Sequence, residues 1–253
     1  MIARAVRGVR GLHRQTGCGP FGDITADFEP AAEFAFVNRA SEAEVPAAYA
    51  EFAGLRFRAE MAGIAARAVL VGGRFHEVDS SRRGCELAVR AAVRRLRADL
   101  GLPRVAVPGD VPELVRLRRV LLTAMNGGPI TSGWESAYAA VLERRIGTEG
   151  FVAFVLDGAQ GLAAAGIGTI TEGLPSPSNP AGINGTLLGM ATDPRERRRG
   201  HARRIVEALM VWFRAEGAAR IDLNATTEGE GLYRSFGFTP PPFPALTWRR
   251  VTS

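Results

Sequence analysis

The clearest helical pattern in the chain lies at residues 82–100. Apolar side chains recur there every three or four positions and form one stripe, which consists of Cys85, Ala88, Val89, Ala92, Val93, Leu96 and Leu100. Gly101 and Pro103 follow at once, and a glycine with a proline behind it is a typical helix stop. The pattern therefore predicts a helix with one buried face, capped at its start by Asp79 or Ser80.

The pattern changes after this helix, and we place a domain boundary there, between residues 1–102 and 103–253. Residues 104–107 are typical of a short strand. Two helices are predicted next, at about residues 111–121 and 134–145. Asp110 stands directly before the first of them and is expected to be its N-cap.

The remaining patterns predict a sheet whose strands alternate with helices. Two apolar runs at residues 151–156 and 162–170 flank a turn at Asp157 and Gly158, which is typical of a hairpin. Further strands are expected at residues 187–192, 220–224 and 246–248, and further helices around residues 205–213 and 231–235. The order β-α-α-β-β-β-α-β-α-β predicts the α/β (α+β) class, with a mixed sheet and helices on both faces.

The turn at residues 193–202 combines several features of an anion-binding site. It joins a strand to a helix N-terminus, where backbone N–H groups are unpaired and the helix dipole is positive. Gly200 and Ala202 leave room for an anion to reach the backbone, and the guanidinium groups of residues 197–199 can add charge-assisted hydrogen bonds. These residues alone leave two alternatives open, a phosphate cradle and an ordinary solvated turn.

The composition limits the size class, the location and the kinds of partner that we expect. The chain has 253 residues, 46% hydrophobic and 23% charged, enough for one large domain or two small ones. No apolar run approaches the roughly 18 residues of a membrane span, and no apolar segment follows the N-terminal arginines, so we expect a cytoplasmic protein. Two cysteines and three histidines lack metal-ligand or disulfide spacing, so no metal site is expected. The net charge of +6 favours acidic partners such as nucleotides or RNA.

The turn and a later segment together resemble the GNAT N-acetyltransferases. The acetyl-CoA signature of that family, Val/Thr-x-Pro-x-x-Arg-x-x-Gly-x-Ala, is matched by Thr192, Pro194, Arg197, Gly200 and Ala202. Residues 231–238, Gly-Leu-Tyr-Arg-Ser-Phe-Gly-Phe, resemble the Leu-Tyr-x-x-x-Gly-Phe segment that closes the family's cofactor site. The resemblance covers about residues 103–253 and implies the acyl-CoA N-acetyltransferase fold, with acetyl-CoA as the donor.

The resemblance also implies that two strands splay apart at the turn, so that the pantetheine amides of CoA insert between them. The implied cofactor contacts are the backbone of Met190, Ala191 and Thr192 for pantetheine, and Arg197, Arg198, Arg199, Gly200, His201 and Ala202 around the pyrophosphate. His201 is expected to face phosphate or solvent. Thr226 takes the place of an asparagine found in many relatives, which is the basis for expecting a further contact there.

Direct transfer to an amine requires a proton donor for the departing thiolate and a base for the amine. Tyr233 is the implied acid, because a phenol with a pKa of about 10 can protonate a thiolate. Glu172 and Asp222 are both candidates for the base, and a chain of water molecules is a third alternative. The segment 171–185 suits a loop that shapes the acceptor pocket, although a plain surface connection is an equal alternative.

Residues 13–100 resemble the fourth domain of elongation factor G in three segments, which are residues 13–30, 34–38 and 72–81. The last of these, Gly-Gly-Arg-Phe-His-Glu-Val-Asp-Ser-Ser, is the most specific. The resemblance implies a βαβ domain like the second domain of ribosomal protein S5, with His76 and residues 17–22 on the tip that enters the ribosome. Translocase activity is not implied, because the chain carries no GTPase domain.

Together these inferences predict an acetyl-CoA-dependent N-acetyltransferase whose acceptor is a primary amine on a small molecule or a protein N-terminus. The alternative is a ribosome- or RNA-binding protein with a catalytically inactive acetyltransferase-like half. A third role is association, in which the N-terminal half packs on the other half or on a second copy to form a homodimer. The juxtaposition of the two halves suggests ribosomal proteins or ribosome-directed antibiotics as acceptors, which is an analogy and not chemistry.

Overall fold

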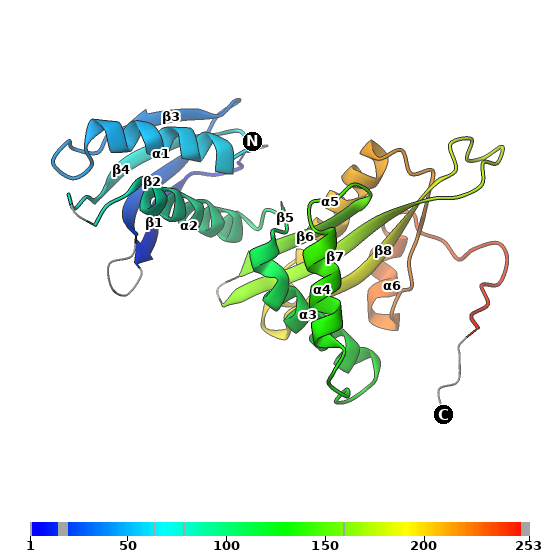
Figure 1. Ribbon diagram of the computed structural model, residues 1–253. Coiled ribbons are helices and arrows are strands. Elements are labelled where there is room, and N and C mark those ends of the chain that lie inside the picture. Colours follow the sequence, from blue (N-terminus) through cyan, green and yellow to red (C-terminus); the bar gives the residue numbers. More distant parts are fainter. Residues whose placement is uncertain (1, 15–19, 63, 78, 159, 249–253) are drawn as a thin grey trace.

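The chain builds two separate β-sheets, each packed against helices (Figure 1). The computed structural model describes residues 2–14, 20–62, 64–77, 79–158 and 160–248. One sheet uses strands from the first part of the chain, and the other uses strands from the second part. The two sets of strands are separated by helix α2 (Arg82–Leu100), which ends at Gly101 in the left-handed conformation, as its stop pattern predicts.

The first sheet has four strands in the order β1-β2-β4-β3. They are β1 (Val6–Arg14), β2 (Phe21–Pro30), β3 (Ala35–Asn38) and β4 (Ala66–Arg74). Strands β1, β2 and β4 are antiparallel neighbours, whereas β3 runs parallel to β4. Helix α1 (Ala47–Glu60) connects β3 to β4, so these three elements form a βαβ unit.

Helix α2 lies directly against the backbone of β1 and β2. A Cβ atom on Gly11 would lie 1.9 Å from the carbonyl oxygen of Ala88, and one on Gly22 would lie 2.0 Å from that of Gly84. Gly84 in turn approaches the carbonyl oxygen of Phe21, which a Cβ atom would meet at 1.9 Å. Only glycine permits this approach. The predicted apolar stripe of α2 faces the sheet and is buried there, together with Phe28, Phe57 and Leu70.

The N-cap of α2 is Ser81, so the prediction of Asp79 or Ser80 is wrong by one or two residues. The Ser81 side chain accepts a hydrogen bond from the N–H of Gly84 at 3.0 Å. Both predicted residues bond to His76 instead. The Ser80 hydroxyl accepts the N–H of His76 at 2.9 Å, and the Asp79 carboxylate lies 3.3 Å from the His76 Nδ1 atom. Residues 15–19, which include part of the predicted tip loop, lie outside the described residues.

The second sheet has five strands in the order β5-β6-β7-β8-β9. They are β5 (Arg104–Val105), β6 (Phe151–Gly158), β7 (Gly161–Glu172), β8 (Ile183–Thr192) and β9 (Arg220–Asp222). Neighbours are antiparallel except β8 and β9, which confirms the predicted mixed sheet. Helices α3 (Val111–Met125) and α4 (Glu135–Arg145) cover one face, and α5 (His201–Ala215) and α6 (Thr227–Arg234) the other (Figure 1). Within the described part of the chain, none of the helices is long and apolar enough to cross a membrane.

The strand predicted at residues 246–248 does not form, and this prediction is wrong. Leu246 and Trp248 are 93% and 85% exposed, so their alternating pattern does not reflect a buried face. The preceding segment contains Pro240, Pro241, Pro242 and Pro244. Proline removes the N–H group that a strand needs for pairing, and four of them within five residues carry the chain away from the sheet.

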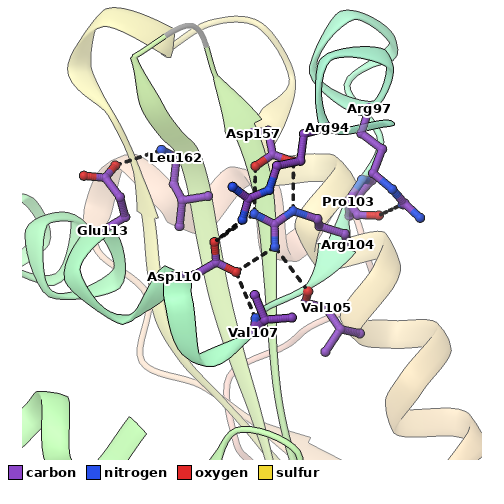
Figure 2. Close-up of polar contacts among 10 residues, drawn as sticks. All are labelled: Arg94, Arg97, Pro103, Arg104, Val105, Val107, Asp110, Glu113, Asp157 and Leu162. Carbon is purple, nitrogen blue, oxygen red and sulfur yellow. Dashed lines mark hydrogen bonds and ion pairs between the residues drawn. The ribbon is translucent and has the colours of Figure 1, made fainter. Parts of the chain in front are cut away.

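A cluster of ion pairs joins α2 to the second sheet, as Figure 2 shows. The guanidinium group of Arg104 donates to Asp110 at 2.6 and 2.9 Å and to Asp157 at 2.8 Å. Arg94 of α2 also donates to Asp110, at 3.3 Å. Asp110 is the N-cap residue of α3, as predicted, but its side chain makes no capping hydrogen bond. Its carboxylate turns back toward Arg104 and accepts the N–H of Val107 at 2.9 Å.

Candidate active site

The turn between β8 and α5 presents a row of backbone N–H groups. After a short 3-10 helix at Pro194–Glu196, Arg198 adopts a φ of 64° and Gly200 a φ of 76°. In the described part of the chain, Arg198 is the only non-glycine residue with a positive φ. The N–H groups of residues 198–202 have no hydrogen-bond partner among the described residues. Consecutive free N–H groups at a helix N-terminus form a concave anion-binding surface.

The side chains of this turn keep the anion-binding surface open and positively charged. A Cβ atom on Gly200 would meet no other atom within 4 Å, so the space in front of the backbone is accessible. Arg197 and Arg198 are exposed, and neither pairs with a carboxylate in the described ranges. Arg199 differs, because it donates to Glu196 at 2.7 Å. The unpaired charge available to a phosphate is therefore that of Arg197 and Arg198.

His201 does not face solvent as expected. Its side chain is 11% exposed, and both ring nitrogens are buried without a hydrogen-bond partner in the described structure. The nearest carboxylate oxygen, on Glu196, lies 3.6 Å from the Nε2 atom. The imidazole is therefore mostly buried, and the free group that His201 contributes to the anion-binding surface is its backbone N–H.

The start of the turn is held by α3. Asp193 accepts the N–H of Arg195 at 2.9 Å and a guanidinium N–H of Arg116 at 2.6 Å. These two donors hold the pKa of the Asp193 carboxyl below its usual value. Arg116 also donates to the carbonyl oxygen of Leu162 at 2.8 Å and to Glu113 at 2.9 Å. One side chain thus fixes the turn to the first residues of β7.

Strands β8 and β9 separate at the end that leads into the turn. They pair only over residues 184–186 of β8 and 220–222 of β9. Beyond this point β8 continues to Thr192 with β7 on one side and no described strand on the other, so residues 187–192 present a free edge. Gly189, with a φ of 59°, interrupts the pairing with β7 within this segment. A free strand edge accepts an extended amide chain.

Tyr233 lies in α6 on the face of the sheet that α5 also covers. It is 7% exposed and packs edge-on against the ring of Phe238, with the ring centroids 6.0 Å apart. Burial raises the pKa of its phenol. Thr226 caps the same helix, because its hydroxyl accepts the N–H of Gly229 at 3.2 Å. A cofactor contact from Thr226 would therefore use a hydroxyl that already accepts the capping hydrogen bond of α6.

The comparison with known protein families decides what this arrangement is. Residues 122–238 match the sequence model of the acetyltransferase (GNAT) family. This segment is a GNAT acetyltransferase domain. The match includes only the last turn of α3, from residue 122 onward, and all of α4, α5, α6 and strands β6 to β9. It begins beyond the first sheet, so the resemblance of residues 13–100 to elongation factor G stays a prediction.

Solved structures show the same fold for the GNAT domain. A protein from Clostridium acetobutylicum, described as a predicted acetyltransferase and solved with acetyl-CoA, is 19% identical with a TM-score of 0.52. The match covers 59% of this chain and 94% of that protein. A GCN5-related N-acetyltransferase from Ralstonia eutropha is 21% identical with a TM-score of 0.51, over 58% of this chain and 97% of that one. No curated protein sequence gives a significant match.

The two carboxylates considered as the base lie near the same end of β8 but on opposite faces of the sheet. Glu172 is exposed at the last position of β7 and pairs with Ile183, three positions before Thr186. Ile170 packs with α5, so the alternation along β7 places Glu172 on the α5 face. Asp222 pairs with Thr186 in the register, which is the point where β9 leaves β8. Asp222 therefore stands at the mouth of the opening.

The face of the GNAT domain that carries α3 and α4 contains a charged and aromatic group that the sequence analysis missed. Arg118 lies beside the bulge of β8, with its Nη1 atom 3.9 Å from the position that a Cβ atom on Gly189 would take. Its guanidinium group also lies 5.8 Å from the ring centre of Tyr138. The sequence feature that could have pointed to Arg118 is its position directly after Leu117, on the edge of the buried stripe of α3.

Proposed function

We propose that the protein transfers an acetyl group from acetyl-CoA directly to a primary amine. The observation that carries this proposal is the combination of two features at one end of β8. One is the row of free N–H groups in the turn, and the other is the free edge of residues 187–192 that leads to it. The first suits a pyrophosphate and the second suits a chain of amides, which occur together in CoA.

The residues present fit this donor. Arg197 and Arg198 supply the positive charge that a pyrophosphate requires, and Gly200 leaves the backbone N–H groups accessible. The backbone groups of residues 190–192, in the free segment of β8, would bond the pantetheine amides. Arg199 remains a proposed contact, although its pairing with Glu196 leaves it less charge to offer.

The chemistry requires the amine nitrogen to attack the thioester carbonyl carbon, after which the carbon–sulfur bond breaks and the sulfur takes a proton. We assign that proton to the Tyr233 phenol. Burial raises its pKa, so the phenol keeps its proton at neutral pH and can donate it. Because a thiol is a stronger acid than a phenol, the transfer is efficient only while the thiolate is forming and a hydrogen bond to it already exists.

The amine must lose a proton before or during the attack. We assign this proton to Asp222 or to a water molecule beside it, and no longer to Glu172. Ile221 packs among residues of α5 and α6, so the alternation along β9 directs Asp222 to the opposite face, where α3 and α4 lie. The acceptor would then approach from the α3 side, and the donor would enter along the strand edge.

The first test is a calorimetric titration of the full chain with acetyl-CoA, with CoA and with acetyl phosphate. We expect acetyl-CoA and CoA to bind with similar affinity, because the turn and the strand edge recognise the shared part. Acetyl phosphate should bind far more weakly. No heat of binding with acetyl-CoA, in a protein shown to be folded by circular dichroism, would overturn the proposal.

For the N-terminal sheet we propose association with the ribosome in the cytoplasm, on the basis of its resemblance to elongation factor G. The βαβ unit of β3, α1 and β4 supports this. The arginines on the open sheet face do not, because Arg7 pairs with Asp27, Arg10 with Asp23 and Arg67 with Glu29. Co-sedimentation with ribosomes at two salt concentrations tests the proposal, and light scattering tests a homodimer.

A further inference from the structure

Helix α3 carries two neighbouring arginines in different environments, and the difference points to a ligand. Arg119 pairs with Glu135, and its guanidinium group also lies 6.0 Å from the ring centre of Trp134. Arg118 is half-buried, yet it donates no hydrogen bond and pairs with no carboxylate among the described residues. A half-buried guanidinium group whose N–H donors form no hydrogen bond is unfavourable, because those donors have lost water without gaining an acceptor.

The position of Arg118 connects it to the proposed acetyl transfer. Its Nη1 atom is near Gly189, which lies within the free segment of β8. Ile167 of β7, a residue of the core on the α3 side, is also close to Gly189. Asp222 projects to the same side of the sheet from the point where β9 leaves β8. The Asp222 carboxylate, which accepts a hydrogen bond from Arg220 at 2.9 Å, and the guanidinium group of Arg118 therefore face the same side at the opening between the strands.

We propose that Arg118 binds an anionic group on the acceptor, so that the preferred acceptors are primary amines that also carry a carboxylate or a phosphate. This inference rests on the proposed acetyltransferase activity and names the chemical class of its second substrate. The planar guanidinium fork matches both oxyanions, because it can donate two parallel hydrogen bonds to either. The Tyr138 ring beneath it restricts the orientation of the fork.

This assignment disfavours cationic acceptors. Aminoglycosides and polyamines carry several positive charges and would meet Arg118 as a like charge beside the transfer site. Like-charge contacts of this kind are unfavourable and shape specificity. Under this proposal, the ribosome-directed antibiotics that the sequence suggests are not the preferred acceptors.

The test is a panel of amines in matched pairs, measured by thiol release from acetyl-CoA. One pair is L-phenylalanine and L-phenylalaninamide, and another is phosphoethanolamine and ethanolamine. Spermidine and kanamycin represent cationic amines. We expect the anionic member of at least one pair to be acetylated with a kcat/KM about tenfold or more above that of its neutral partner. The two pairs separate a carboxylate from a phosphate preference.

The matched variants are Arg118→Gln and Arg119→Gln, which remove the same charge from adjacent positions. We expect R118Q to raise the KM for the anionic acceptor by about 10- to 100-fold while kcat changes little, because only acceptor binding is affected. Arg118→Lys should restore part of the loss, since a lysine keeps the charge without the fork. R119Q should change neither constant by more than about threefold.

Three results would overturn the proposal. One is acetylation confined to neutral or cationic amines, or of no anionic member of the panel. Another is an equal loss in R118Q and R119Q. The last is a fall in the thermal midpoint of R118Q that accounts for its loss of activity. Calorimetric binding of acetyl-CoA to each variant keeps these outcomes separate from a failure of the acetyltransferase proposal, which would abolish that binding in the unmodified protein.

Discussion

Arg116 of α3 donates to Asp193 at 2.6 Å, which ties a helix on one face of the sheet to the turn after β8. The same guanidinium group reaches the carbonyl oxygen of Leu162 and the carboxylate of Glu113. The turn is thereby fixed at its start, while its later residues keep their N–H groups free. Binding at such a turn benefits from this fixed geometry, because less conformational entropy is lost when the anion arrives.

Arg116→Met should therefore weaken acetyl-CoA binding and lower stability. The variant removes the guanidinium donor of the Leu162 carbonyl group and one of the two donors of Asp193, which keeps the N–H of Arg195. We expect this to cost about 1–3 kcal/mol in the free energy of unfolding. The Kd for acetyl-CoA, measured by calorimetry, should rise several-fold. Arg144→Met is the control, because Arg144 is an exposed residue of α4, and it should alter both quantities little. An unchanged Kd would show that the turn keeps its shape without Arg116.

Gly200→Trp should abolish acetyl-CoA binding. Its φ of 76° disfavours any side chain, and the indole would fill the accessible space in front of the N–H groups. Gly147→Trp provides a matched control, because Gly147 also has a positive φ, of 87°, and no atom within 4 Å of a Cβ position. We expect the two variants to lose similar stability in thermal melts. Acetyl-CoA binding by G200W equal to that of G147W would contradict the assigned cradle.

Tyr233→Phe should lower kcat by about 100-fold or more, within the range typical of a lost general acid, and change the Kd for acetyl-CoA little. Because burial raises the Tyr233 pKa, the rate of the unmodified enzyme should not fall from loss of this proton below about pH 10. Tyr49→Phe is the control, since Tyr49 is buried to a similar degree in the first sheet's core. A kcat for Y233F close to that of Y49F would exclude the acid role.

Asp222→Asn and Glu172→Gln distinguish the two carboxylates considered as the base. We expect D222N to reduce kcat/KM by about 10- to 100-fold at neutral pH, with a smaller deficit at high pH, where the amine is already deprotonated. E172Q should behave as the unmodified enzyme, because the alternation along β7 places Glu172 on the α5 face, opposite to Asp222. Equal activity of both variants across the pH range would favour a water chain alone.

Arg104→Met should destabilise the fold strongly. Arg104 is 12% exposed and pairs with Asp110 and Asp157, which are 5% and 13% exposed (Figure 2). Its removal leaves Asp157 without its cation and Asp110 with only the longer contact to Arg94. The loss for such a broken buried pair is about 3–5 kcal/mol. Arg4→Met, which removes an exposed pair with Asp99, should cost less than about 1 kcal/mol. Denaturant unfolding measures both.

The same cluster predicts an acid-sensitive stability. Burial alone would raise the pKa of Asp110, but Arg104 and the N–H of Val107 outweigh it and hold that pKa below its usual value. The carboxylate therefore stabilises the folded chain above the unfolded pKa of about 3.9. This contribution disappears as the pH falls below that value and through the folded pKa. Asp110→Asn should remove this part of the pH dependence.

Local patterns predicted most of the second sheet and the turn correctly. Helix α2 was predictable because its stripe and Gly101 lie within one short window. The turn was predictable because its glycine, arginines and following helix are adjacent in the sequence. Contacts of Thr226 and Arg199 with a cofactor are predicted by the family motif alone and by no local pattern.

The failures concern relationships between distant residues. Glu172 was a candidate because its strand was predictable, whereas the sheet face that it takes depends on the packing of Ile170 against α5. Arg118 escaped notice because the sequence cannot show that Glu135 turns to Arg119 and leaves its neighbour unpaired. The strand predicted at 246–248 followed the alternation of apolar residues and neglected the prolines before it.

The contact between α2 and the first sheet has a consequence for tracing the ancestry of this half of the chain. Gly11, Gly22 and Gly84 each lie where a methyl group would meet a main-chain oxygen at 2.0 Å or less. A side chain at any of these positions would collide with the backbone, and no change of rotamer would relieve the collision. These positions therefore tolerate almost no substitution. A distant homologue that has lost all other likeness should therefore still carry glycine at these three places.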